Sequence, residues 1–264
     1  TNEGGINFID TAELYPVPAS QLTATKTESF IGSWLKNQNR HDLVIASKVI
    51  ANSSGLGWVR GGPKPTKENF RTAIEASLRR LNTDYLDLYQ IHWPSRNTPL
   101  FGTGVYNPDN EREGLNIREQ AEVMNEFIDE GKIRHWGLSN ENSWGVMKFV
   151  FECEKKGLKK PVSIQNAYNL VNRSFEDSLF ETCYRENIGL LPYSPLAFGF
   201  LTGKYLNNPN AKGRINEFEG FAYRYNKPNA QPAIEGYVTL AKELGLSPAQ
   251  FALAFVNDRK FVTS

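Results

Sequence analysis

The sequence predicts an α/β fold in which short β-strands alternate with amphipathic helices. Short runs rich in β-branched and aromatic residues recur along the chain, and the segments between them repeat apolar residues with a helical period. Near-continuous apolar strands that alternate with helices are typical of a parallel sheet, because helices cover its faces. A third observation, the unequal length of the loops, indicates how that sheet closes.

Seven strands are expected in this 264-residue chain. They span residues 6–10, 43–48, 85–92, 133–139, 161–166, 188–194 and 261–264. The helical period is clearest at Phe70, Ile74, Leu78 and Leu81, and again at Met124, Phe127 and Ile128. Thr66, and Ser247 followed by Pro248, are typical residues at the start of a helix. We expect both ends of the sequence to be cut, because it begins at Thr1 and ends inside a strand-like run.

The loops that follow strands are long, whereas those that follow helices are short. The long loops span 12–27, 49–66, 93–117 and 195–232, and the short ones span 39–42, 82–84 and 130–132. Long loops on one face favour a (β/α)8 TIM barrel, although a doubly wound sheet shows the same alternation. A barrel has eight strands, so one would precede Thr1. We expect one barrel domain over residues 1–264 that lacks the first strand and most of the eighth unit.

The composition is that of an ordinary globular protein, with 40% hydrophobic and 12% aromatic residues. Lys and Arg number 30 against 29 Asp and Glu, so the formal net charge is +1. This balance lacks the basic excess typical of nucleic-acid binders. No apolar run approaches the ~18 residues that a membrane span needs. Two cysteines give no disulfide framework and indicate a reducing compartment, so we expect a cytoplasmic protein.

Polar residues stand where the predicted strands end. They are Asp10, Lys48, His92, Ser139, Asn140, Gln165, Asn166, Tyr193 and Ser194. In a barrel these positions converge on one site. A polar residue also simply ends a strand and begins a loop, which is the alternative for any single position. Lys48 is the clearest case, because burying an unpaired ammonium is costly, and Asp10 could supply its counter-ion.

Tyr15 lies five residues beyond Asp10 and can act as a general acid. A phenol ordinarily has a pKa of ~10, and a nearby ammonium lowers that value. A phenol so tuned can donate a proton to a carbonyl oxygen while another agent delivers hydride. His92 could orient the carbonyl or share the proton. Because this set contains no nucleophile, it predicts proton transfer to an oxygen and not acyl transfer.

Hydride transfer needs a cofactor. The sequence has neither a complete Rossmann glycine motif nor a Walker A loop, and no HExxH or CxxC motif offers a metal site, so no metal is expected. The candidate cofactor segment is YSPLAFGFLTGKY at residues 193–205, where small residues allow close approach of the backbone. Its Lys204, with Arg214 ten residues later, suits a pyrophosphate or a ribose phosphate. The alternative is a surface loop with solvated cations.

These motifs, in this order, are similar to those of the aldo-keto reductase family, and the resemblance covers essentially the whole chain. It implies a (β/α)8 TIM barrel. The catalytic tetrad that it implies, from FIDTAELY, IASK and DLYQIHWP, is Asp10, Tyr15, Lys48 and His92. It also implies that Ser139 and Asn140 in GKIRHWGLSNE, and Gln165 in IQNAYNL, bind the nicotinamide amide.

The resemblance assigns segment 193–205 to the cofactor. It implies that Tyr193 stacks on the nicotinamide ring. The residues that it places along the pyrophosphate are Ser194, Pro195, Leu196, Ala197, Phe198 and Gly199. Lys204 and Arg214 match positions that hold the phosphates and the adenine end in the branch that contains potassium-channel β subunits. AELYPVP and YLDLYQIHWP are most similar to the Tas-type bacterial reductases.

The resemblance implies reduction of an aldehyde or ketone by NADPH, with Tyr15 protonating the nascent alkoxide beside His92. Trp93 and the loop 94–117 would line the mouth of the site, and the implied partner is a small-molecule carbonyl substrate. The alternative is a regulatory or redox-sensing subunit that binds NADPH and turns over slowly. The complete tetrad favours the enzyme, because a purely binding role does not require Tyr15 and His92.

Overall fold

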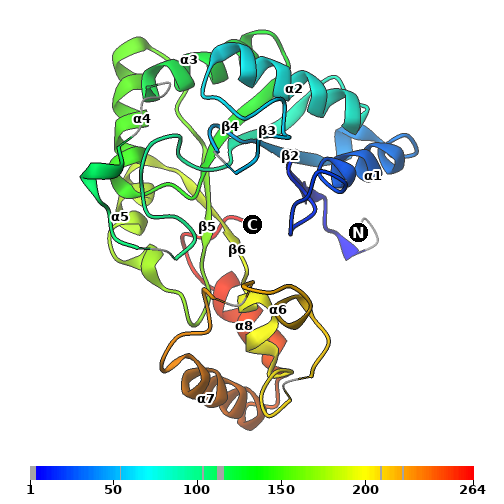
Figure 1. Ribbon diagram of the computed structural model, residues 1–264, viewed down its shortest axis with the longest axis vertical. Coiled ribbons are helices and arrows are strands. Elements are labelled where there is room, and N and C mark those ends of the chain that lie inside the picture. The colour runs from blue at the N-terminus through cyan, green and yellow to red at the C-terminus, as the bar shows by residue number, and fades with distance from the viewer. Residues whose placement is uncertain (1–3, 54, 103, 112–115, 209, 222) are drawn as a thin grey trace. The chain divides into compact units, whose positions relative to one another are not determined.

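The computed structural model of the chain describes residues 4–53, 55–102, 104–111, 116–208, 210–221 and 223–264. Strands and helices alternate along them (Figure 1), which confirms the predicted α/β class. The chain forms two compact units. The first consists of Thr1–Thr98 and Val105–Ile164, and the second of Pro99–Gly104 and Gln165–Ser264.

The described residues of the first unit form parallel strands and the helices that cover them. The strands are β1 (Phe8–Asp10), β2 (Val44–Val49), β3 (Leu86–Ile91) and β4 (Ile133–Ser139), and the helices are α1 (Lys26–Leu35), α2 (Lys67–Leu81), α3 (Ile117–Asp129) and α4 (Ser143–Lys156). Short 3-10 segments are η2 (Arg40–Asp42) and η3 (Pro108–Asn110). The register places Lys48 beside Gln90, and Gln90 beside Gly137. The helices lie on one face of these strands (Figure 1).

Side chains that accept hydrogen bonds from the first backbone N–H groups set where α2, α3 and α4 begin. Thr66, predicted as a helix start, accepts from the Asn69 N–H and begins α2. Asn116 and Glu119 form a capping box at α3, in which each side chain accepts from the backbone N–H of the other. The long strand-to-helix loops therefore end at defined residues.

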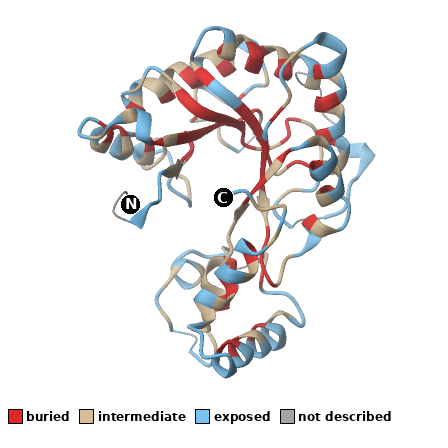
Figure 2. Cartoon of the chain, turned by 180° about the vertical axis from the view of Figure 1, so that it is seen from behind, coloured by how far each residue is buried: buried red, intermediate tan, exposed pale blue. Residues whose placement is uncertain are grey.

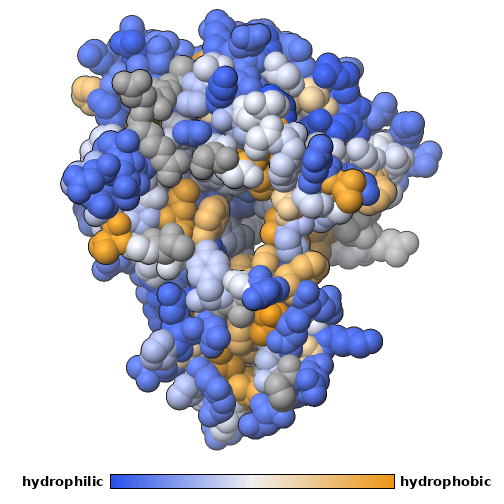
Figure 3. Space-filling model, in the orientation of Figure 1, coloured by the Kyte–Doolittle hydropathy of each residue, from blue (hydrophilic) through white to orange (hydrophobic). Residues whose placement is uncertain are grey.

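The core of the first unit lies between its helices and strands. β3 is buried along its whole length (Figure 2). The residues that the helical period places in the core are fully buried: Phe70, Ile74, Leu81, Met124 and Phe127. Leu78 and Ile128 are half-buried at the edges of the same faces. Hydrophilic side chains predominate on the outer surfaces of α2 and α3 (Figure 3).

The strand β5 (Ser163–Ala167) begins in the first unit and ends in the second. The other described elements of the second unit are β6 (Gly189–Tyr193), α5 (Leu179–Glu186), α6 (Arg214–Glu217), α7 (Ala230–Glu243), α8 (Pro248–Asn257), η4 (Ser174–Glu176) and η5 (Ala197–Thr202). Leu201, Ile234 and Val238 lie in its core. Ser247 forms a capping box with Gln250, so α8 begins where the sequence predicts.

The last predicted strand, 261–264, is a single bridge in the structure. Val262 pairs in parallel with Leu190 of β6. The Leu190 N–H donates to the Phe261 carbonyl at 3.0 Å, and the Thr263 N–H donates to the Leu190 carbonyl at 2.9 Å. These two bonds begin the pairing that a strand at this position would extend.

Hydrogen bonding places the six strands of the described residues in the order β1-β2-β3-β4-β5-β6. Consecutive order is that of a (β/α)8 barrel, whereas a doubly wound sheet reverses its order at a switch point. The structure therefore favours the barrel. Closure into eight strands and a single domain over residues 1–264 stay predictions.

Candidate active site

Lys48 on β2 and Asp10 at the end of β1 form an ion pair. The Lys48 side chain is fully buried, and its Nζ donates to Asp10 Oδ2 at 2.5 Å and to the Thr11 carbonyl at 2.9 Å. An ammonium removed from water is tolerated when it is paired and hydrogen-bonded. The structure thus brings together the two residues that the sequence pairs.

Tyr15 lies beside this ion pair in the loop that follows β1. The Lys48 Nζ is 4.8 Å from the centroid of the Tyr15 ring. The backbone N–H of Tyr15 donates to the Ala12 carbonyl at 3.1 Å, and the Tyr15 carbonyl accepts from the Thr27 N–H. These bonds fold the loop so that the phenol ring stays next to the ammonium.

His92 comes directly after β3 and meets Tyr15. The two rings pack edge to face, with centroids 5.7 Å apart and planes at 77°. Burial lowers the pKa of His92 well below 6.5, and the charge of Lys48 lowers it further. The imidazole is therefore neutral at pH 7. Its buried Nδ1 has no hydrogen-bond partner among the residues that the structure describes.

Trp93 forms an apolar wall next to these groups. Its ring centroid is 4.7 Å from that of His92, and its Nε1 donates to the Asn52 carbonyl at 2.7 Å. It packs on a small cluster that includes Leu14 and Ile50. The predicted substrate loop 94–117 contains residues 103 and 112–115, which lie outside the described residues.

A buried ion pair fastens the loop that carries Tyr15, and the sequence gives no signal for it. Glu13 is buried, and its Oε1 accepts from the Ile50 N–H at 2.7 Å while its Oε2 pairs with Arg60. Arg60 also donates to the Ile50 carbonyl and to Asn69 Oδ1, each at 3.0 Å. The loop after β1 is thereby held to the loop after β2.

A second buried pair joins the loops after β3 and β4. Arg96 donates to both oxygens of Glu141, at 2.7 and 2.6 Å. Next to it, the predicted amide ligands Ser139 and Asn140 adjoin His92, because Asn140 Nδ2 donates to Ser139 Oγ at 3.1 Å and to the His92 carbonyl at 2.9 Å. The third predicted amide ligand, Gln165, lies on β5 in the second unit.

In the second unit, Arg224 holds Tyr193, the predicted partner of the nicotinamide ring. Arg224 Nη1 donates to the Tyr193 hydroxyl at 2.9 Å, and Arg224 Nε donates to the Phe101 carbonyl at 3.0 Å. Asn169 holds the next residue, because its buried Nδ2 donates to the Ser194 carbonyl at 2.8 Å. Sequence reasoning missed both residues. Arg224 lies outside the recognised motifs, and Asn169 lies in IQNAYNL, where the resemblance assigns a role only to Gln165.

The segment after β6 has an unusual backbone. The residues with positive φ in it are Ser194, Ala197, Phe198, Gly199 and Gly203. Such a run is rare for residues with a side chain and is typical of functional turns. Pro195 and Leu196 lie within the same turn, which therefore contains the whole predicted pyrophosphate segment.

Lys204 lies between two glycines of this unit. A Cβ on Gly199 would lie 3.2 Å from Lys204 Cε, and one on Gly213 would lie 2.7 Å from Lys204 Nζ. Gly213 directly precedes Arg214. The backbone next to Arg214 therefore lies close to the Lys204 side chain. Lys204 and Arg214 are exposed, and neither forms an ion pair with a carboxylate of the described residues.

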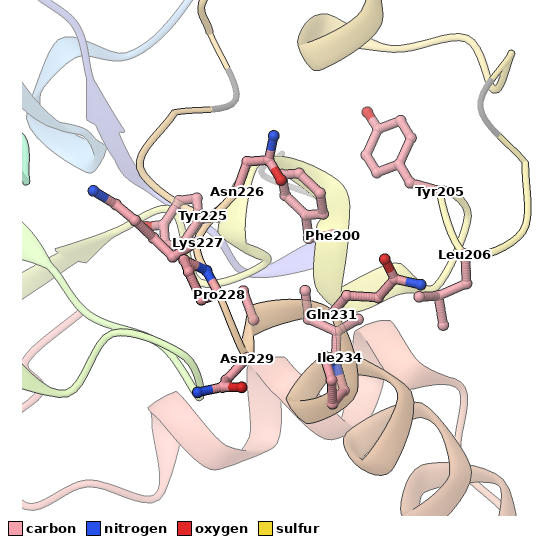
Figure 4. A pocket seen from close by; sticks show the side chains of 12 residues that line it. Phe200, Tyr205, Leu206, Tyr225, Asn226, Lys227, Pro228, Asn229, Gln231 and Ile234 are labelled. Carbon is pink, nitrogen blue, oxygen red and sulfur yellow. The ribbon is translucent and has the colours of Figure 1, made fainter.

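A cavity of about 300 Å³ opens beside this segment (Figure 4). Phe200 and Tyr205 line it from the cofactor segment, and Gln231 and Ile234 line it from α7. The sequence gives no signal for it, because it depends on how the loop before α7 folds.

The described residues include no group of three or more His, Cys, Asp or Glu side chains that could hold a metal ion. Among the same residues, no helix combines the length and apolarity that crossing a bilayer requires.

At the strand ends of this parallel α/β fold, the Tyr15 phenol, the neutral His92 imidazole and the buried Lys48–Asp10 pair lie together, as proton donation to an oxygen requires. The chain matches the Aldo/keto reductase family over residues 2–264 and belongs to it. It is 44% identical over 262 residues to Protein tas of Escherichia coli, covering 98% of this chain and 76% of that protein.

Two further relatives broaden the comparison. An aldo-keto reductase of Babesia bovis is 38% identical over 84% of this chain and 83% of its own length. A probable voltage-gated potassium channel subunit beta of Arabidopsis thaliana is 28% identical over 98% of this chain and 73% of its own. The family resemblance is thus confirmed, and the protein is an oxidoreductase that acts on carbonyl groups.

Proposed function

We propose that the protein reduces aldehydes or ketones to alcohols with NADPH, and that Tyr15 donates the proton. The observation that carries this proposal is the position of the buried Lys48 Nζ, 4.8 Å from the Tyr15 ring and 2.5 Å from Asp10 Oδ2. A fixed ammonium stabilises the phenolate that remains after proton donation. Asp10 in turn keeps Lys48 charged inside the fold.

His92 completes the donor site in this proposal. Its neutral ring, edge to face with Tyr15, can hold a carbonyl oxygen without competing as a stronger acid. Trp93 gives the substrate an apolar wall. The substrate class supported by this arrangement is a small molecule with an aldehyde or ketone group next to an apolar body.

The residues of the second unit fit a dinucleotide cofactor, which would supply the hydride when bound. The glycines at 199 and 213 leave space against Lys204 that a Cβ would fill. Lys204 and Arg214 leave their charge available for phosphate, and the positive-φ turn exposes backbone to it. Tyr193, held by Arg224, would present its ring to the nicotinamide, with Ser139, Asn140 and Gln165 at the amide.

We also propose a cytoplasmic location, which two free cysteines support. Cys153 and Cys183 are buried, and burial raises the pKa of each thiol to about 12. They therefore stay protonated near neutral pH and are not poised for disulfide exchange.

The test is NADPH oxidation with an activated aromatic aldehyde, comparing the unmodified protein with Tyr15→Phe. We expect kcat to fall by about two to four orders of magnitude in the variant, because the general acid is lost. The dissociation constant for NADPH, from cofactor fluorescence, should be unchanged. Tyr184→Phe, at an exposed position on α5, is the control and should keep full activity.

Two results would contradict this proposal. Equal turnover in the unmodified protein and Tyr15→Phe would exclude Tyr15 as the acid. NADPH binding without turnover of any carbonyl compound would favour a regulatory subunit over a reductase.

A further inference from the structure

We propose that Gln90 is a positioning residue for carbonyl reduction, acting through Asp10 on Lys48. Gln90 Nε2 donates to Asp10 Oδ1 at 3.2 Å, while Asp10 Oδ2 accepts from Lys48. The inference rests on the proposed function, because it assigns Gln90 to the same proton-donating site.

The register of the sheet produces this arrangement. Lys48 on β2 and Gln90 on β3 are direct partners in the parallel ladder, so their side chains lie on the same face. Asp10 ends the three-residue strand β1 and reaches both of them. Asp10 is 29% exposed, so its carboxylate lies at the boundary with water, and each bond to it helps to fix its orientation. Gln90 supplies that second bond.

Gln90 itself is held in place by its neighbours. It is fully buried, and its partner in the next strand is Gly137. A Cβ on Gly137 would lie 3.4 Å from Gln90 Cγ and 2.4 Å from Ser163 Oγ, so the glycine leaves space that these side chains use. The amide therefore has a fixed position beneath Asp10.

Burying the Gln90 amide is unfavourable, which indicates that its bond to Asp10 has a role in the site. Gln90 Oε1 is buried and has no hydrogen-bond partner in the described part of the chain. A buried polar atom without a partner is unfavourable, and a leucine would fill the same space without that cost. The compensating interaction is the bond from Nε2 to the carboxylate that pairs with Lys48.

The test uses two variants at this position and the single-turnover rate of hydride transfer between pH 5 and 9. Gln90→Leu removes the donor, so the rate should fall about tenfold or more at every pH, since bonds to charged groups are among the stronger ones. In Gln90→Glu, a protonated carboxyl can donate to Asp10 Oδ1 again. The rate should approach that of the unmodified protein at low pH.

The rate of Gln90→Glu should then fall as pH rises. Two carboxyls within hydrogen-bonding distance share one proton to a higher pH than either alone, and its loss leaves two negative charges beside Lys48. The other titratable groups near this position are Tyr15 from the loop after β1, His92 from the end of β3, and His135 of β4, which is the ladder partner of Leu88 two residues before Gln90. Burial and the charge of Lys48 hold the pKa of His92 well below 6.5.

Ser163→Ala is the matched control, because Ser163 is also buried and its Oγ has no hydrogen-bond partner among the described residues, Asp10 included. This variant should retain the unmodified rate. NADPH affinity and thermal unfolding report whether each variant folds. The inference is wrong if Gln90→Leu keeps its rate, if both variants lose the same rate at all pH values, or if neither folds. Failure of the reductase proposal is separate, since the unmodified protein would then be inactive or as active as Tyr15→Phe.

Discussion

Cationic side chains have different environments in the two units of the molecule. At the strand ends of the first unit, cations are buried or half-buried and each is paired with a carboxylate: Lys48 with Asp10, Arg60 with Glu13, and Arg96 with Glu141. In the cofactor segment of the second unit, Lys204 and Arg214 are exposed. They lie over aromatic rings, with Lys204 Nζ 4.8 Å from the Tyr205 centroid and the Arg214 guanidinium 5.2 Å from that of Phe221.

We interpret this difference as a separation between groups that the fold itself holds and groups that, in the proposed function, bind a ligand. A paired, buried charge has a fixed position and an altered environment, which suits a residue that must act on a reacting oxygen. A cation already paired with a carboxylate attracts a phosphate only weakly, because the carboxylate offsets its charge. The contrast predicts that changes in the first unit act on rate and stability, whereas changes at the exposed cations act on cofactor affinity alone.

Lys48→Met is the strongest test of the first half of this contrast. Replacing the ammonium by an apolar side chain of similar length removes the charge beside Tyr15, so we expect single-turnover reduction to slow by about two to four orders of magnitude. Asp10 is partly exposed and can be solvated, so the protein should still fold. Stopped-flow NADPH fluorescence measures the rate, and a rate within tenfold of the unmodified protein would contradict the assignment.

Glu13→Gln breaks a buried pair outside the reacting groups. It leaves Arg60, with 10% of its side chain exposed, without its carboxylate, and we expect the free energy of unfolding to fall by about 3–5 kcal/mol. Glu126→Gln breaks exposed pairs with Lys67 and Arg71 and should cost about 1 kcal/mol or less. Urea denaturation compares the two, and equal losses would show that burial does not distinguish these pairs.

How far the sequence predicts the site depends on whether a feature is local. Lys48 and Asp10 stand at the ends of apolar strands, where a charge has few explanations, and the structure pairs them. Helix starts at Thr66 and Ser247 follow from hydrogen bonds within one turn. The position of each charge at its strand end, and the start of each helix, can be recognised from a few neighbouring residues, and opposite charges at two strand ends are enough to predict the pair.

Features that depend on distant contacts were beyond the sequence. Glu13 and Arg60 are 47 positions apart, and nothing near either residue indicates the other. Gln90 lies two residues before His92 in a predicted strand, but its bond to Asp10 requires the register of three strands. Asn169 and Arg224 support the cofactor segment through contacts 25 and 31 positions away. Register and loop packing are set by the whole fold.

The burial of His92 predicts that the free energy of unfolding depends on pH. Burial holds its pKa in the folded protein well below 6.5, whereas the unfolded chain takes up the proton near pH 6.5. Because the unfolded state then binds more protons, the free energy of unfolding should fall as pH drops from 6.5 to 5, by up to about 1.4 kcal/mol per pH unit. Urea titrations at several pH values measure this slope.

A variant at His92 isolates its contribution. His92→Asn should reduce the slope between pH 6.5 and 5. An identical slope in His92→Asn would mean that other groups cause the acid sensitivity and that His92 is not held neutral by the fold.

The smallest effects are expected at the exposed cations. Lys204→Met and Arg214→Met should each weaken NADPH binding by about two- to fivefold, because interactions of exposed charges are worth about 1 kcal/mol or less. Both losses should shrink at high salt, since exposed charges are screened. Lys212→Met, an exposed cation in the same loop, is the control and should bind NADPH normally. Unfolding free energies should not change in any of the three. If Lys204→Met lowered stability as Glu13→Gln does, its charge would serve the fold, and the division between held and available charges would fail at the residue on which it most depends.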